Sequence, residues 1–258
     1  MALSYVLAIK LVLAPVLVAA ATSAGYRFGP KVTGWIAGFP VVAGPILLLF
    51  TLEQGPEFAA KAAESSLLGV VSLVGFCVMF LFVARNYSWQ LSVLCGWVFY
   101  GCSTFLLQKL SSPWWVSAIV ALAAVRAAKY LLAKPNSPLL PRTVLRWDIP
   151  ARMAATAVLV VLLTHAASGL GSQLSGLLTP FPVVTTVIAV FAQRDQGYAG
   201  AMRTLQGLLA SMPAFVVFCL VLALILVPFG PWVAFVSAIA GNVVLLSWAL
   251  TRLRRHGR

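Results

Sequence analysis

Acidic side chains are scarce in this chain of 258 residues: Asp and Glu together number 5, against 18 Lys and Arg. Histidine occurs twice and cysteine four times, and neither a CxxC nor a His-x-x-His spacing is present. The sequence also lacks a nucleophile elbow, a phosphate-binding loop and a paired-carboxylate cleft. These absences argue against an enzyme, and we expect no metal site and no cofactor.

Polar surface is equally scarce, because 62% of the residues are hydrophobic and only 9% are charged. Such a chain cannot cover a water-soluble globule with polar groups. Apolar runs of about 18 residues or more recur from end to end, and each is long enough to cross a bilayer as a helix. We therefore predict an all-α polytopic membrane protein with nine transmembrane helices. The predicted spans are 4–24, 33–52, 58–84, 89–108, 112–132, 150–168, 173–193, 199–228 and 231–251.

The basic residues are distributed unevenly across these nine crossings. All Lys and Arg residues except Lys10, Lys61 and Lys109 fall on one side. Loops rich in Lys and Arg stay in the cytoplasm, so we expect a multi-pass protein of the cell inner membrane with its N-terminus outside and its C-terminus cytoplasmic. The positive charge then reflects topology and contact with anionic membrane lipids, not nucleic-acid binding.

The sequence contains an internal repeat. Three motifs occur twice: Phe-Pro-Val-Val at 39–42 and 181–184, an acidic residue with Gln-Gly at 53–55 and 195–197, and Phe-Cys at 76–77 and 218–219. One offset of 142 residues relates all three pairs, and the same offset aligns Lys10 with Arg152. Roughly 19 identities occur in the about 68 ungapped positions that begin there.

The repeat predicts three regions. A first four-helix repeat occupies 1–110, a connector helix with a cytoplasmic Pro-rich loop occupies 111–147, and a second four-helix repeat occupies 148–258. The single connector helix turns the second copy upside down, which gives a 4+1+4 arrangement with an inverted repeat. Inverted repeats are typical of secondary transporters.

The matched prolines are the main candidates for a binding site. Phe39-Pro40 and Phe181-Pro182 each lie within an apolar span, where proline removes a backbone hydrogen bond and breaks the helix. Transporters use paired broken helices to bind substrate near the middle of the membrane. The alternative is a pair of packing kinks without a ligand. We expect these four residues to bind substrate.

Polar residues near the span ends give further hypotheses. Glu53 and Asp195 are gating candidates or, alternatively, acids that complement helix N-termini. Gln54 and Gln196 beside them are expected to contact substrate toward opposite mouths. His165, late in the span 150–168, is a proton-coupling candidate, or else a hydrogen-bonded histidine at the membrane interface.

The second copy resembles a known family. The stretch 175–182, then Asp195-Gln196-Gly197, Ala201-Met202-Arg203 and Pro213, is similar to the GlpM-like family of small bacterial inner-membrane proteins. Members have about half this length and roughly four helices, so the resemblance implies two fused, antiparallel units. It covers each half separately, and it implies no substrate.

These observations favour a secondary transporter or facilitator of a small solute that works by alternating access. The shortage of buried charge favours an uncharged, zwitterionic or amphiphilic solute. The expected partners are that small molecule and membrane lipids. The alternative function is a non-transporting membrane scaffold or assembly factor of an envelope pathway.

Overall fold

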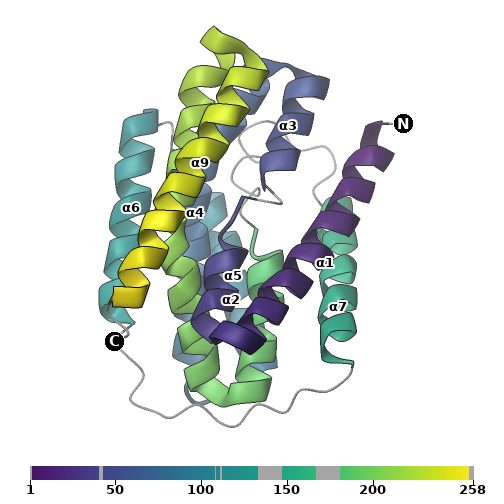
Figure 1. The fold of residues 1–258 in the computed structure, drawn as a ribbon, viewed down its shortest axis with the longest axis vertical. Coiled ribbons are helices and arrows are strands. Elements are labelled where there is room, and N and C mark those ends of the chain that lie inside the picture. The colour runs from purple at the N-terminus through teal and green to yellow at the C-terminus, as the bar shows by residue number, and fades with distance from the viewer. Residues whose placement is uncertain are drawn as a thin grey trace.

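The computed structural model describes residues 2–40, 43–107, 109–110, 112–132, 147–166 and 181–255 (Figure 1). Every regular element in these ranges is a helix, which confirms the predicted all-α fold for this part of the chain. The helices are α1 (Ala2–Phe28), α2 (Pro30–Ala37), α3 (Ala43–Gln54), α4 (Pro56–Ala84), α5 (Trp89–Leu107), α6 (Trp114–Leu131), α7 (Asp148–Ala166) and α9 (Val183–Arg255). The Pro-rich loop 134–141 and residues 173–180 of one predicted span lie outside the described residues. The count of nine crossings stays a prediction.

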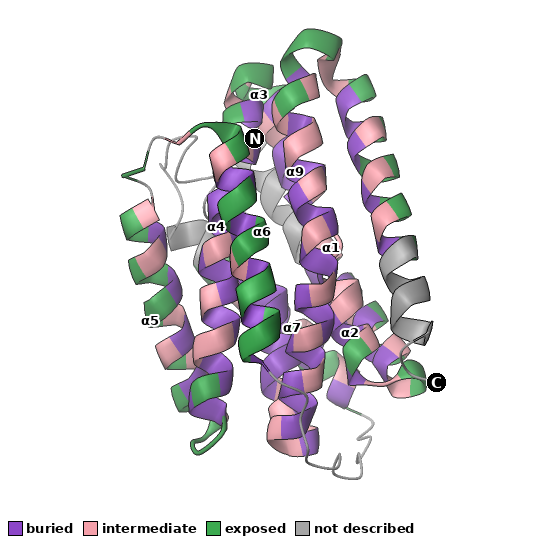
Figure 2. Cartoon of the chain, turned by 90° about the vertical axis from the view of Figure 1, so that its left-hand side faces the viewer, coloured by how far each residue is buried: buried purple, intermediate pink, exposed green. Residues whose placement is uncertain are grey.

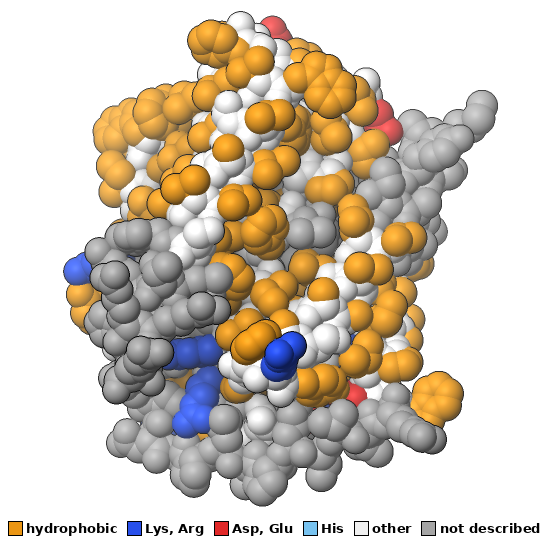
Figure 3. All heavy atoms as spheres, in the orientation of Figure 1, with side chains coloured by type: hydrophobic (Ala, Val, Ile, Leu, Met, Phe, Trp, Pro, Cys, Tyr) orange, Lys and Arg blue, Asp and Glu red, His pale blue; other side chains and the backbone are white. Residues whose placement is uncertain are grey.

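The outer surface of the bundle is apolar. Helices α4, α5 and α6 and the stretch Val183–Ser247 are each long and apolar enough to cross a membrane. Large side chains such as Phe82, Leu106 and Trp232 are more than half exposed, and Figure 3 shows apolar groups spread over the described part of the visible face. Water disfavours so much contiguous apolar surface, whereas lipid tails do not. The chain is a multi-pass membrane protein.

Glycines with positive φ mark the turns of the bundle. Helix α1 is followed by α2 after Gly29 (φ 91°), and α9 turns at Gly197 (φ 66°); both turns lie in the lower part of Figure 1, which we call the lower end. Helix α3 is followed by α4 after Gly55 (φ 90°), and α9 turns again at Gly230 (φ 80°); both turns lie at the top of Figure 1, which we call the upper end. Residues with a Cβ are strained in this backbone region, so glycine permits these reversals. Gly197 and Gly230 divide α9 into three segments, 183–196, 198–229 and 231–255.

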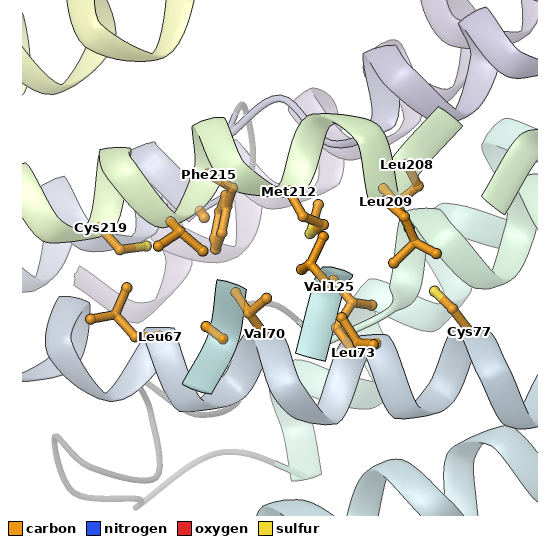
Figure 4. Close-up of a cluster of buried hydrophobic side chains, with 14 of the residues drawn as sticks. Leu67, Val70, Leu73, Cys77, Val125, Leu208, Leu209, Met212, Phe215 and Cys219 are labelled. Atoms are coloured by element: carbon orange, nitrogen blue, oxygen red, sulfur yellow. The ribbon is translucent and has the colours of Figure 1, made fainter. Parts of the chain in front are cut away.

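The core lies between α4 and the second segment of α9, which run antiparallel (Figure 4). In this view Leu67 lies across from Cys219, and Cys77 lies across from Leu209. All four side chains are buried in one apolar cluster. Helices α5 and α6 cover this pair from outside and expose part of their surface, as Figure 2 shows. We call the contact between α4 and residues 198–229 the central seam.

Helix α2 packs on the second segment of α9 at very short range. A Cβ added to Gly34 would lie 1.6 Å from the carbonyl oxygen of Thr204. A Cβ added to Gly207 would lie 1.9 Å from the carbonyl oxygen of Lys31. Glycine at both positions lets the two backbones touch, as small residues do between membrane helices.

Helix boundaries recur at the offset found in the sequence. Adding 142 to Gly55 gives Gly197, and both glycines have positive φ. Adding 142 to Pro56 and Trp89, which begin α4 and α5, gives 198 and 231, where the second and third segments of α9 begin. The two halves of the chain therefore change direction at matching positions.

Candidate functional site

The predicted span 33–52 is broken in the structure. Helix α2 ends at Ala37 and α3 begins at Ala43. The Phe39 amide donates to the Ile36 carbonyl at 3.0 Å, which closes a 3₁₀-type turn that is one residue shorter than an α-helical turn. Pro40 has no amide hydrogen to continue the helix. The backbone then recovers where the Gly44 amide donates to the Pro40 carbonyl at 2.7 Å. We call residues 38–40 the first break.

The second Phe-Pro motif stands at the start of α9. The Thr186 amide donates to the Pro182 carbonyl at 2.7 Å, which is the bond that Gly44 and Pro40 make 142 residues earlier. Phe181 packs edge-on against Tyr100, with ring centroids 5.1 Å apart. Residues before Phe181 are not described, so we call 181–182 the second break for its position alone.

The two breaks lie in the middle of the bundle. Both the end of α2 and the beginning of α9 are near mid-height in Figure 1. Phe181 and Val183 pack in the same apolar cluster as Ile36 and Ala37, between α1 and α7. Pro40 and Pro182 are buried, and Phe39 and Phe181 are half-buried. The structure thus brings the second break next to the residues that precede the first.

The two acidic turns lie at opposite ends. Glu53 and Gln54 are exposed at the upper end, beside Gly55. Asp195 is half-buried and Gln196 is buried at the lower end, beside Gly197. Both glutamines therefore lie away from the breaks, toward the two faces of the molecule, and whether they bind substrate stays a prediction.

Asp195 belongs to a buried ionic cluster that the sequence did not predict. Arg152 is 1% exposed and contacts Asp148 through Nε–Oδ1 and Nη2–Oδ2 pairs, each at 3.0 Å. The same guanidinium reaches Asp195 Oδ2 at 2.5 Å and lies 4.5 Å from the centroid of the Phe191 ring. The Tyr26 hydroxyl donates to Asp148.

This cluster joins three helices at the lower end: α1 through Tyr26, α7 through Asp148 and Arg152, and α9 through Asp195. Removing Arg152 would leave Asp148 and Asp195 without their shared cation, which is costly in a low-dielectric interior. The contact among the three helices therefore depends most on Arg152.

No family model, curated protein or solved structure matches this chain. The resemblance to GlpM-like proteins therefore stays a prediction, and the site rests on its geometry.

Several buried polar atoms have no hydrogen-bond partner among the residues that the structure describes. They are Thr22 Oγ1, Trp35 Nε1, Gln193 Oε1, Thr204 Oγ1 and both amide atoms of Asn242. Asn242 is fully buried, in the third segment of α9. A polar residue within an apolar span is a functional candidate by default, and this signal was available in the sequence.

His165 lies in the last turn of α7, where the side chains are outside the described part of the structure. Its role in proton coupling therefore stays a prediction. Within the described residues, no group of three or more His, Cys, Asp or Glu side chains could hold a metal ion.

Proposed function

We propose that this chain is a secondary transporter or facilitator that moves a small uncharged, zwitterionic or amphiphilic solute by alternating access. Two inverted four-helix units, joined through α6, would rock about the mid-height breaks. The observation that carries the proposal is that a helix begins soon after each Phe-Pro motif, with the same 2.7 Å hydrogen bond to the carbonyl of Pro40 and of Pro182.

The inverted relation of the halves is supported by the directions of their turns. Gly55 and Gly197 occupy equivalent positions but lie at opposite ends of the bundle. A polypeptide copy that keeps its turn but reverses its orientation is related to the original by a twofold axis in the membrane plane.

The central seam supports the same axis. Adding 142 to Leu67 and Cys77 gives Leu209 and Cys219, so the pair Leu67 and Cys219 becomes the pair Cys77 and Leu209 when the halves are exchanged. Mutual exchange of contacts is the property of an interface that lies on a twofold axis.

The ionic cluster supplies one gate of the proposed cycle. Arg152 and Asp195 hold α7 to α9 at the lower end, and the matching positions in the first copy carry Lys10 and Glu53. Opposite charges at both pairs of positions favour one ion pair per membrane face. The described state would then be closed at the lower end. At the upper end, Glu53 of the other proposed pair is exposed.

The lower end is proposed to face the cytoplasm. The Lys and Arg side chains visible in Figure 3 lie in the lower half of the molecule, in agreement with the side expected from the sequence. This orientation puts the N-terminus of α1 outside and the C-terminus of the chain inside the cell.

The test begins with ligand discovery. The purified protein in detergent is heated with members of a library of small neutral, zwitterionic and amphiphilic solutes, because a ligand specific for the native state raises the unfolding temperature. A stabilising solute is then offered in radiolabelled form to proteoliposomes that contain the wild type, Pro40→Ala or Pro182→Ala.

A transporter loses flux in both proline variants while each remains inserted and folded, because an intact helix closes the proposed site. The matched control is Pro113→Ala, at the exposed start of α6 outside either break. Equal flux in all four proteins would contradict the proposal. A library without any stabilising solute would favour the membrane scaffold.

A further inference from the structure

The third segment of α9 presents one buried stripe to the protein. Ala234, Ala238, Asn242 and Leu246 follow one another at intervals of four residues, and all are buried. Residues at this spacing share a helix face. The amide on this stripe is fully buried, and within the described part of the chain neither its oxygen nor its nitrogen has a hydrogen-bond partner. An apolar side chain would fill such a position at lower cost, so the amide calls for a ligand.

Asn242 and the first break converge on the same part of α9. A Cβ added to Gly241 would lie 3.7 Å from Val217, and a Cβ added to Gly44 would lie 3.5 Å from Phe218. Val217 and Phe218 are consecutive residues of the second segment. The helix that carries Asn242 and the helix that resumes after Pro40 therefore approach neighbouring residues of the same segment.

The second break shows what occupies the equivalent place in the other half. Tyr100 packs edge-on against Phe181. Trp97 lies 6.1 Å from the same ring, and its indole nitrogen donates to Thr186 Oγ1 at 3.1 Å. Large side chains of α5 thus cover Phe181, and the indole nitrogen of Trp97 has a hydrogen-bond partner in Thr186.

The residues at the matching positions of the repeat are all smaller. Adding 142 to Trp97 and Tyr100 gives Ile239 and Asn242, and subtracting 142 from Thr186 gives Gly44. Isoleucine replaces an indole, a carboxamide replaces a phenol and hydrogen replaces a hydroxyethyl group. Of the two matching residues in the third segment of α9, Ile239 is 49% exposed and Asn242 is fully buried.

We propose that Asn242 is the ligand contact of this protein, and that its ligand is a neutral molecule with both hydrogen-bond donors and acceptors, such as a polyol or an amide. This inference rests on the proposed transporter and its inverted repeat. A carboxamide accepts through Oδ1 and donates through Nδ2. It neutralises no charge, so an ionic ligand would be buried without compensation.

The experiment measures thermal unfolding of the purified, full-length protein with defined probes. The neutral probes are glycerol, myo-inositol and acetamide, and the charged probes are glutamate and choline. Asn242→Leu is compared with Ser237→Ala, a half-buried position on the same segment but off the stripe. At least one neutral probe is expected to stabilise the wild type and Ser237→Ala.

Asn242→Leu is expected to unfold at a higher temperature than the wild type without probe, because it removes an unpaired buried amide of similar size. Its apparent affinity for the neutral probe should fall by about tenfold or more. A variant that is less stable and keeps the probe response would overturn the inference, since Asn242 would then be a structural residue.

A second variant covers the case in which Asn242→Leu does not fold. Asn242→Cys is labelled with methyl methanethiosulfonate, and the neutral probe should slow its labelling while glutamate should not. Labelling that is indifferent to every neutral probe overturns the inference. Stabilisation by a charged probe that Pro40→Ala abolishes would overturn it as well, yet leave the transporter proposal standing.

Discussion

Arg152 is a guanidinium almost without contact with solvent, in a chain that has few acids to neutralise it. Two of the five acidic residues, Asp148 and Asp195, are placed against it from different helices, and Phe191 covers its face. Because burial of an unpaired charge is costly, the two acids stabilise the contact among the three helices in addition to their apolar packing.

Asp195→Asn tests this contact directly. The substitution removes one charged partner of Arg152 while Asp148 remains, so we expect a loss of about 2 kcal/mol of unfolding free energy. The matched control is Glu53→Gln at the equivalent position of the first copy, which is exposed and should change stability by less than about 0.5 kcal/mol. Thermal unfolding in detergent measures both, and equal losses would show that Asp195 is no more than a surface acid.

The same substitution should open the lower end. Thr156 is fully buried one turn beyond Arg152, so a cysteine there is shielded while the cluster is closed. In inside-out vesicles, a membrane-impermeant maleimide should label Thr156→Cys several-fold faster when Asp195→Asn is also present. An unchanged labelling rate would mean that the ionic cluster does not act as a gate.

At the scale of the helix, close backbone contact fixes α2 on α9. Gly34→Ala puts a methyl group into the Thr204 carbonyl, so the two helices must separate, at a cost of about 1–3 kcal/mol. Gly101→Ala on α5 meets nothing within 4 Å and should gain up to about 1 kcal/mol from helix propensity. Thermal unfolding of the two variants should therefore shift in opposite directions, and a neutral Gly34→Ala would refute tight α2–α9 packing.

The helix positions were largely accessible from the sequence, since apolar runs and Pro or Gly punctuation decide where a membrane helix begins and ends. The break after Ala37 follows from Pro40 for this reason. The division of α9 at Gly197 and Gly230 follows from the predicted loops between spans.

The ionic cluster was not accessible in the same way, because it joins residues more than a hundred positions apart, such as Tyr26 and Asp148. Two signals did exist. Asp148 and Arg152 have the i,i+4 spacing of a helical ion pair, and the repeat pairs a base with a base and an acid with an acid at 10/152 and 53/195. Each signal could be found in the sequence by itself. Only the fold shows that Asp148 and Asp195 both contact Arg152.

For the whole molecule, the inverted arrangement makes a prediction about its ends. A reporter fused before residue 2 should be active outside the cell, and one fused after residue 255 should be active in the cytoplasm. Paired alkaline phosphatase and green fluorescent protein fusions measure this. Both reporters on the same side would exclude an odd number of crossings and with it the inverted repeat.

The central seam has a consequence for how the protein unfolds. Since α4 belongs to one half and residues 198–229 to the other, the apolar core contains side chains from both halves. If one repeat unfolds, the core residues of the other repeat, such as Leu67 or Leu209, lose their packing neighbours. Mechanical extraction from a bilayer should therefore release the two repeats in one event, and damage to either should shorten the lifetime of both.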